Sequence, residues 1–196
     1  MGNLTDPTPS APYHAQGDDR ARYDGLSIAL HWATAALVFL QFGLAETWGF
    51  FAKADRDLLI IGHLSFGLVL ASVIVLRIFW RLTFGRKSFE TGQDLIGYIA
   101  RMMHRALYVL IVAEVALGFL TRWTDNQPLS FFGLLIPSPF GTFSKATAGF
   151  VDDIHDVSAW VIMILVGGHT LAALGHHYLL KDDVLRRMLP STNQGD

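Results

Sequence analysis

Cysteine is absent from this chain of 196 residues, and charged residues are scarce, at 16% of the total. Without cysteine the chain forms no disulfide and carries no C-x-x-C-H motif for a covalently attached cofactor. The first 25 residues are polar, contain proline and glycine, and lack an apolar core segment. From this composition we expect no secretory signal peptide in these residues.

Apolar residues are abundant, at 52% of the chain, and the mean hydropathy is +0.36. They form four segments, each about long enough to cross a bilayer: Leu26 to Thr47, Leu58 to Trp80, about Ile96 to Leu120, and about Asp153 to Tyr178. Backbone groups in hydrocarbon must be satisfied within their own segment, so each segment is expected to be a helix. The sequence therefore predicts an all-α fold, a four-helix transmembrane bundle over residues 25–180.

Basic residues predict how this bundle is oriented. Four of them lie on one side of the predicted membrane: Lys53, Arg56, Arg122 and Lys145. The other eleven of the 15 lie in the two tails or around the connection between the second and third segments. The positive-inside rule then places both termini in the cytoplasm of a bacterial inner membrane. We expect residues 1–24 to be a disordered tail and residues 181–196 to be a second cytoplasmic tail.

Four histidines inside these segments are the strongest functional signal, because a spanning helix rarely keeps an ionisable side chain without a function. Alternating helix directions place His31 and His169 near the cytoplasmic face, and His63 and His155 near the outer face. His155 and His169 are roughly 21 Å apart along one helix and point within roughly 40° of each other. Imidazoles on facing helices are typical axial ligands of b-type haem. We predict two haems, held by His63 with His155 and by His31 with His169; a hydrogen-bonded core histidine is the alternative for any single one.

Five stretches also carry a family resemblance over about residues 22 to 190. They are S-I-A-L-H-W at Ser27 to Trp32, G-F-F-A-K-A-D-R ending at Arg56, I-G-H-L-S-F-G around His63, I-H-D around His155, and the long run G-H-T-L-A-A-L-G-H-H-Y-L-L-K-D-D-V-L-R-R-M-L-P from Gly168 to Pro190. The chain resembles the bacterial di-haem cytochrome b561 family, most closely its superoxide:ubiquinone oxidoreductase members. The resemblance implies the same four haem ligands.

For function, the resemblance implies that superoxide outside is oxidised to oxygen and that its electron crosses two non-covalent haems b to ubiquinone. Cytochrome b subunits of formate dehydrogenases and nickel-iron hydrogenases share the arrangement. A haem-bearing membrane subunit that exchanges electrons with a partner redox subunit is therefore the first alternative, and a non-redox membrane metal-binding or transport protein is the second. Expected partners are membrane lipid, ubiquinone, superoxide or that redox subunit, and not nucleic acid.

Further residues are assigned with the resemblance in view. His176 lies seven residues beyond His169 on the same helix face and is the preferred quinone-site residue, with His104 and Lys181 as further candidates. A zinc site at His169, His176 and His177 is the competing interpretation, but it lacks a fourth ligand before Asp182. Residues predicted to steer superoxide, unless they are merely solvated loop charges, are Arg56, Lys53, Arg122 and Lys145.

Two features stay open at this point. Glu114, midway along the third segment, is either a proton relay toward quinone or a side chain that faces water. The loop from Arg122 to Asp152 contains five phenylalanines that either rest on the membrane as a lid over the outer haem or pack without a function: Phe131, Phe132, Phe140, Phe143 and Phe150.

Overall fold

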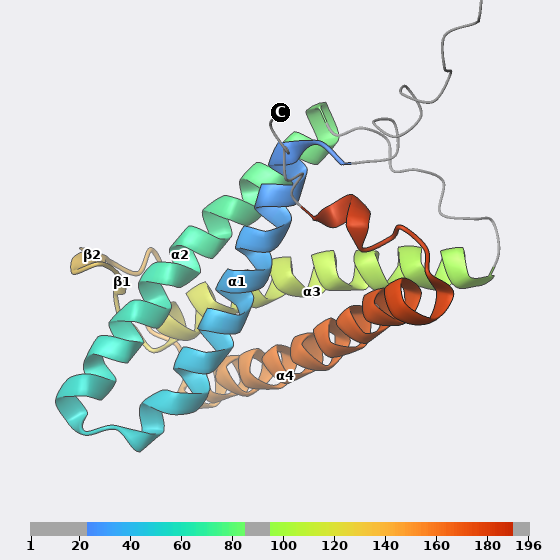
Figure 1. Cartoon of the computed structure of the whole chain (residues 1–196). Coiled ribbons are helices and arrows are strands. Elements are labelled where there is room, and N and C mark those ends of the chain that lie inside the picture. Colours follow the sequence, from blue (N-terminus) through green and yellow to red (C-terminus); the bar gives the residue numbers. More distant parts are fainter. Residues whose placement is uncertain (1–22, 85–94, 190–196) are drawn as a thin grey trace, which may run out of the picture.

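Four long helices dominate the computed structural model, which describes residues 23–84 and 95–189 (Figure 1). They are α1 (Gly25–Thr47), α2 (Lys53–Thr83), α3 (Leu95–Thr124) and α4 (Lys145–Gly175). All four have the length and composition of membrane spans, which confirms the predicted number and order of helices. Nearly all of the predicted N-terminal tail, at residues 1–22, and the end of the C-terminal tail, at residues 190–196, lie outside the described residues.

The helices extend further than the apolar segments that predicted them. Helix α2 begins at Lys53 rather than Leu58, and α4 begins at Lys145 rather than Asp153. Ser144 caps α4 by accepting a hydrogen bond from the Thr147 amide at 3.1 Å. Hydropathy marks the part of a helix that suits hydrocarbon, whereas helical hydrogen bonds continue through polar residues beyond it. The predicted spans are therefore the apolar parts of longer helices.

A small β-hairpin departs from the predicted all-α fold. Strands β1 (Leu129–Phe131) and β2 (Leu134–Ile136) pair antiparallel, with Gly133 in the connecting turn at a φ of +95°. The fully buried hydroxyl of Ser65 on α2 accepts a hydrogen bond from the Phe132 amide at 2.8 Å. This contact joins the loop to a helix 67 residues earlier in the chain. The prediction missed the hairpin because its anchor is distant in sequence.

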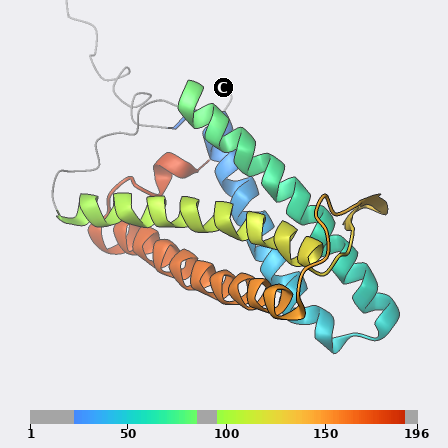
Figure 2. The same ribbon diagram turned by 180° about the vertical axis from the view of Figure 1, so that it is seen from behind.

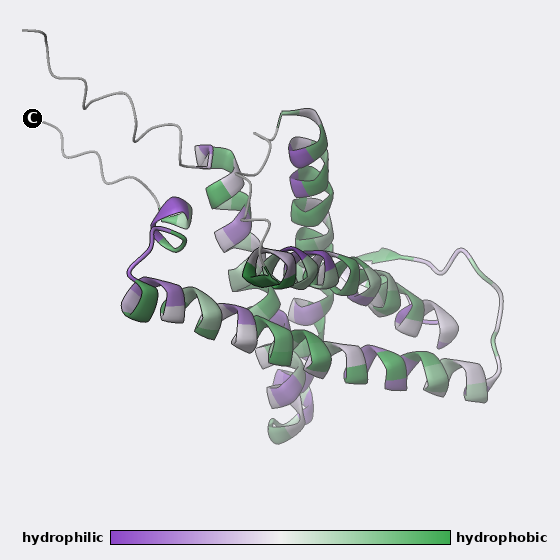
Figure 3. Cartoon of the chain, turned by 90° about the vertical axis from the view of Figure 1, so that its right-hand side faces the viewer, coloured by the Kyte–Doolittle hydropathy of each residue, from purple (hydrophilic) through white to green (hydrophobic). Residues whose placement is uncertain are grey.

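The helices pack in two pairs, α1 along α2 and α3 along α4, and the pairs cross each other (Figures 1 and 2). Buried apolar residues are correspondingly few and lie on the packed faces, as Leu30, Leu70 and Ile162 do. Large apolar side chains are otherwise exposed, and Figure 3 shows hydrophobic residues along all four helices. This distribution suits a protein whose solvent is lipid.

The helices alternate in direction, so the molecule has two distinct ends. The basic end is where α1 and α3 begin and α2 and α4 finish, and it carries Arg77, Arg81, Arg101 and Arg105. The hairpin end is where α1 and α3 finish and α2 and α4 begin. At the basic end α4 passes into a π-helix, η3 (His176–Leu180), and a 3₁₀ turn, η4 (Arg186–Met188). There the indole nitrogen of Trp32 donates to the Met188 carbonyl at 2.7 Å, which brings the C-terminal segment back to α1 (Figure 1).

Asp24 joins α1 to α2 at the basic end. Its carboxylate caps α1 by accepting from the Ser27 amide at 2.8 Å, and it also accepts from the Trp80 indole at 2.9 Å. Partial burial opposes the charged form, but the hydrogen bonds from Ser27 and Trp80 outweigh it and hold the pKa of Asp24 below its usual value. A carboxyl group with a lowered pKa stabilises the fold wherever it is ionised.

We expect Asp24→Ala to destabilise the protein by about 1 kcal/mol at neutral pH, the usual cost of a lost N-cap. The contribution of the charge is fully present above the unfolded-state pKa of 3.8 and is lost as the pH falls through the lower folded-state value. Thermal unfolding in detergent across this pH range measures both effects. Asp24→Asn, which keeps a capping oxygen, serves as the control and should lose less stability.

Candidate functional site

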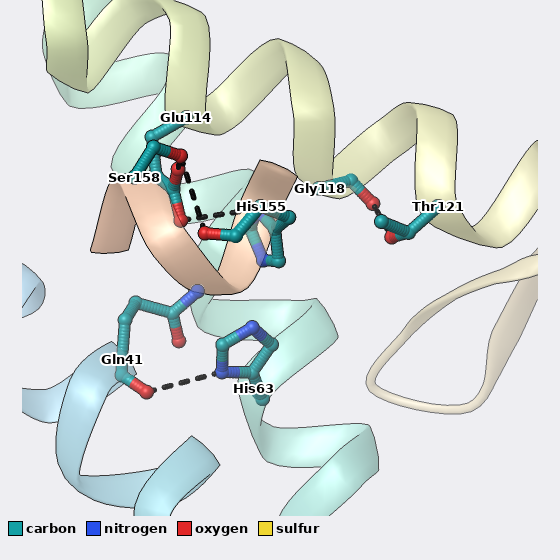
Figure 4. Close-up of polar contacts among 7 residues, drawn as sticks. All are labelled: Gln41, His63, Glu114, Gly118, Thr121, His155 and Ser158. Carbon is teal, nitrogen blue, oxygen red and sulfur yellow. Dashed lines mark hydrogen bonds and ion pairs between the residues drawn. The ribbon is translucent and has the colours of Figure 1, made fainter. Parts of the chain in front are cut away.

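Two histidines face each other at the hairpin end (Figure 4). The ring centroids of His63 on α2 and His155 on α4 are 6.4 Å apart. Both rings line a cavity of about 440 Å³ that is bounded by residues of all four helices. The structure therefore brings together the two histidines that the sequence predicted to share the outer level.

Each of these rings has a partner at Nδ1. The Nδ1 atom of His63 lies 3.1 Å from the backbone carbonyl of Gln41, which only accepts, so Nδ1 carries the proton. The Nδ1 atom of His155 lies 3.0 Å from Glu114 Oε1, where a carboxylate requires the same assignment. Both Nε2 atoms are thereby left with a lone pair, which is the form in which histidine binds a metal.

Glu114 is the residue whose role the sequence left open. Its second oxygen accepts a hydrogen bond from the Ser158 hydroxyl, and its side chain is only 17% exposed (Figure 4). A carboxylate that backs a ligand histidine fixes the tautomer and makes the imidazole a stronger donor to a metal. The structure thus places Glu114 behind His155 in the hairpin-end cavity.

Two glycines make room for these side chains. A Cβ atom at Gly118 would lie 3.3 Å from Cε1 of the His155 ring, and one at Gly67 would lie 2.9 Å from the Gln41 amide nitrogen. The Gln41 side-chain oxygen is buried in the cavity wall without a hydrogen-bond partner in the described part of the chain. Sequence reasoning missed Gly118 and Gln41, although an isolated glycine in a helical pattern is a usual sign of close packing.

The second histidine pair lies at the basic end. His31 on α1 and His169 on α4 have ring centroids 6.4 Å apart, and His104 on α3 packs edge-on against His169 at 5.1 Å. A guanidinium nitrogen of Arg77 lies 3.1 Å from Nδ1 of His31. The same guanidinium also sits over the Tyr108 ring, 5.1 Å from its centre.

The spacing of the rings allows a test of whether the histidines fit an iron. With a metal–nitrogen bond of about 2.0 Å and a ring centre about 1.1 Å behind the nitrogen, two imidazoles on opposite sides of one metal have centroids about 6.2 Å apart. Both 6.4 Å pairs match this value, whereas His104 and His169 at 5.1 Å do not. The four predicted ligands therefore fit two metals with trans imidazoles.

Acidic residues outnumber basic ones on the wall of the hairpin-end cavity. Of the four cations predicted to steer superoxide, Arg122 lines the cavity and donates to the Pro128 carbonyl at 3.3 Å. The other three, Lys53, Arg56 and Lys145, are exposed, and none is among the described residues of the cavity wall. Besides Glu114, the wall includes four more acids: Glu46, Asp125, Asp152 and Asp156.

The predicted quinone-site residues gather at the basic end without forming one cluster. His104 donates from Nδ1 to the Ala100 carbonyl at 2.8 Å and adjoins His169. His176 pairs through Nδ1 with Asp182 Oδ2 at 2.5 Å, while Lys181 is exposed. Slight burial raises the pKa of Asp182, but its hydrogen bond with His176 prevails and keeps that pKa below its usual value. Over residues 23–84 and 95–189, no group of three or more potential metal ligands supports a zinc site here.

Comparison with known proteins identifies the family. The sequence profile described as prokaryotic cytochrome b561 matches residues 22–191. The chain belongs to this family. It is 32% identical to cytochrome b561 homolog 2 of Escherichia coli K12 over 86% of this chain and 91% of that protein. It is 27% identical to the probable superoxide oxidase CybB of Yersinia pestis, over 86% of this chain and 96% of that protein.

A third relative, cytochrome b562 of Cereibacter sphaeroides, is 30% identical over 85% of this chain and 94% of that protein. The family resemblance inferred from the sequence is thus confirmed. Membership makes the chain a membrane electron-transfer protein of a b-type cytochrome family. The chemistry of the two histidine pairs agrees with b-type haem, since both supply neutral imidazole and neither needs cysteine.

The close contact at Gly118 gives a first test of the hairpin-end pair. We expect Gly118→Val to push the His155 ring out of place and to reduce bound haem per chain, as measured by the pyridine haemochrome assay. Gly43→Val is the control, because a Cβ atom at Gly43 meets nothing within 4 Å. Equal haem content in the two variants would show that Gly118 does not set the position of His155.

Proposed function

We propose that this cytochrome b561 holds two b-type haems and passes electrons across the membrane, from superoxide at the hairpin end to ubiquinone at the basic end. The observation that carries the proposal is the pair of 6.4 Å contacts, His63 with His155 and His31 with His169. The name of the Yersinia pestis relative, probable superoxide oxidase, supports superoxide as the donor. Superoxide is oxidised to dioxygen, and two electrons with two protons convert ubiquinone to ubiquinol.

At the hairpin end the chain holds its ligands before any metal arrives. The Gln41 carbonyl accepts a hydrogen bond from Nδ1 of His63, and the Glu114 carboxylate lies 3.0 Å from Nδ1 of His155, so both Nε2 atoms are available to a metal. A haem held by His63 and His155 would supply one-electron transfer.

At the basic end Arg77 is a candidate partner for a haem propionate. His31 would hold iron through Nε2, with its ring proton on Nδ1, and Nδ1 could then no longer accept from Arg77. The Arg77 guanidinium would become available to pair with a carboxylate, such as a haem propionate. Its position over Tyr108 keeps it close to the pair while it turns.

For quinone we propose the region beside His169, bounded by His104 and by the segment that contains His176 and Lys181. His104 touches His169 directly, and its Nδ1–H is already used by Ala100, so its Nε2 accepts a hydrogen bond. Nδ1 of His176 contacts the Asp182 carboxylate just beyond the end of α4, the helix of His169, where quinone reduction takes up protons. The excess of arginine at this end supports a cytoplasmic location for it and for both termini, within the bacterial inner membrane.

A second function, that of a membrane subunit reduced by a partner protein, is favoured by the acidic cavity wall. Superoxide is an anion, so the carboxylates Glu46, Asp125, Asp152 and Asp156 oppose its approach, with Arg122 on the same wall against them. A basic redox partner would be attracted by the same charges. The choice between the two donors is open to a kinetic experiment.

The haem assignment predicts that substitution of either histidine of a pair removes the same haem. We expect two haems b per purified chain by pyridine haemochrome, and one fewer after His63→Ala or His155→Ala, with the same spectral component missing in both. His31→Ala and His169→Ala should both lack the other component. His177→Ala is the control, because this neighbouring histidine belongs to neither pair. A wild-type protein with one haem, or with no haem absorbance, would contradict the assignment.

The donor is tested by ionic strength. If superoxide reduces the isolated protein, its entry past the acidic wall should become faster as salt screens the repulsion, whereas reduction by a basic partner should become slower. Stopped-flow haem reduction with ubiquinone present measures the rate. Asp125→Asn should weaken the salt effect. Absence of reduction by superoxide at any salt concentration excludes the first donor and leaves the partner subunit.

A further inference from the structure

We propose that Glu114 and Arg77 give the two haem sites different reduction potentials, so that electrons run downhill from the hairpin end to the basic end. The inference rests on the proposed haem sites and adds a direction to them. It comes from one juxtaposition: a carboxylate contacts the ring of His155, while a guanidinium contacts the ring of His31.

The carboxylate acts on the hairpin-end site. With Glu114 Oε1 at 3.0 Å, the Nδ1 proton of His155 is drawn toward a negative charge, and the imidazole gains anionic character. Such a ligand stabilises ferric over ferrous iron and lowers the reduction potential. The opposite ligand, His63, has only a neutral peptide carbonyl at Nδ1, so the effect originates on the α4 side.

Ser158 holds the carboxylate in place. Its hydroxyl donates to Glu114 Oε2, which leaves Oε1 directed at His155 (Figure 4). Both side chains of the pair are more than four-fifths buried, with exposures of 19% for His155 and 17% for Glu114, so water screens the charge weakly. Glu114 is thus a positioning residue that acts on the iron through His155.

Cations act on the other site. Arg77 lies 3.1 Å from the His31 ring, and both Arg77 and Arg81 sit over Tyr108, at 5.1 Å and 5.4 Å from its centre. Even after Arg77 releases Nδ1 of His31, the stacking on Tyr108 holds positive charge beside this pair. Positive charge favours the state with one more electron, so the basic-end potential is raised.

Together the two charges define the direction of transfer. An electron taken from superoxide at the hairpin end enters the site of lower potential and leaves it for the site of higher potential. It then passes to ubiquinone, which needs two such electrons and two protons to become ubiquinol. Reversal of this order would require the carboxylate and the guanidinium to exchange ends.

The test is a redox titration of the purified holoprotein in nanodiscs, followed by haem absorbance. We expect Glu114→Gln to raise the hairpin-end midpoint by a roughly tenfold change in the ferric-to-ferrous equilibrium, about 59 mV for one electron. The basic-end midpoint should not move. Glu46→Gln is the matched control, because it removes one negative charge from the same cavity wall at an exposed position.

Two further variants should each lower a midpoint, the opposite of the shift expected for Glu114→Gln. Ser158→Ala removes the hydrogen bond to Glu114 Oε2, so the carboxylate acts more strongly on His155 and the hairpin-end midpoint should fall. Arg77→Gln should lower the basic-end midpoint, and Arg105→Gln, at an exposed position of the same end, should change it less. Ser158→Ala decides the question if Glu114→Gln does not assemble.

The outcomes separate the inference from the function on which it rests. The single-haem variants His63→Ala and His169→Ala assign each midpoint to an end. If two haems are present and Glu114→Gln shifts the hairpin-end midpoint no more than Glu46→Gln, the inference is overturned and the proposed function stands. If the wild type does not hold two haems, the proposed function itself fails.

Discussion

Each imidazole held within a spanning helix of this protein has two ring nitrogens that need partners, and the rest of the site follows from that constraint. Hydrocarbon offers neither a donor nor an acceptor, so a polar atom left alone there costs several kcal/mol, on the order of the penalty for any unsatisfied group. At the hairpin end the chain supplies one partner at Nδ1 for each ring, through Gln41 and Glu114. The ring centroids of His63 and His155 lie 6.4 Å apart, a spacing that suits a metal between the two rings.

The kind of group that lies beside Nδ1 affects the imidazole in more ways than by supplying a hydrogen-bond partner. A peptide carbonyl and a carboxylate both fix the same tautomer, but only the carboxylate adds charge to the ligand. Glu114 is costly to keep in a spanning helix, and a hydrogen bond from Ser158 and the ion-pair contact with His155 offset that cost. At His31 the neighbour is instead a cation, so the two chemically similar pairs sit in opposite electrostatic surroundings.

The sequence was sufficient to find the histidines within apolar segments. It was not sufficient to find features that depend on contacts between residues far apart in the chain. Histidines are rare in spanning segments, so His31, His63, His155 and His169 were visible, and alternation of helix direction gave the pairs that the structure brings to 6.4 Å. Their role as ligands stays a prediction. Gln41 acts through its backbone carbonyl, which every residue has, so its identity gave no signal. The β-hairpin depends on Ser65, and the site of Glu114 depends on Ser158, 44 residues away.

If superoxide is the donor, as proposed, the acidic residues at the hairpin end affect electron transfer in two opposed ways. Carboxylates on the cavity wall slow the arrival of an anion by repulsion, which salt screens over about 10 Å at 0.1 M. The same charges, with Glu114 in direct contact with His155, disfavour retention of an electron once it has arrived. Such a site would receive the anionic donor more slowly, but it would have a larger driving force for electron transfer to the basic-end site. Such a balance suits an electron-transfer protein whose donor is a strong reductant. Transfer from the donor to the hairpin-end site would remain favourable, and transfer from there to the basic-end site would be faster.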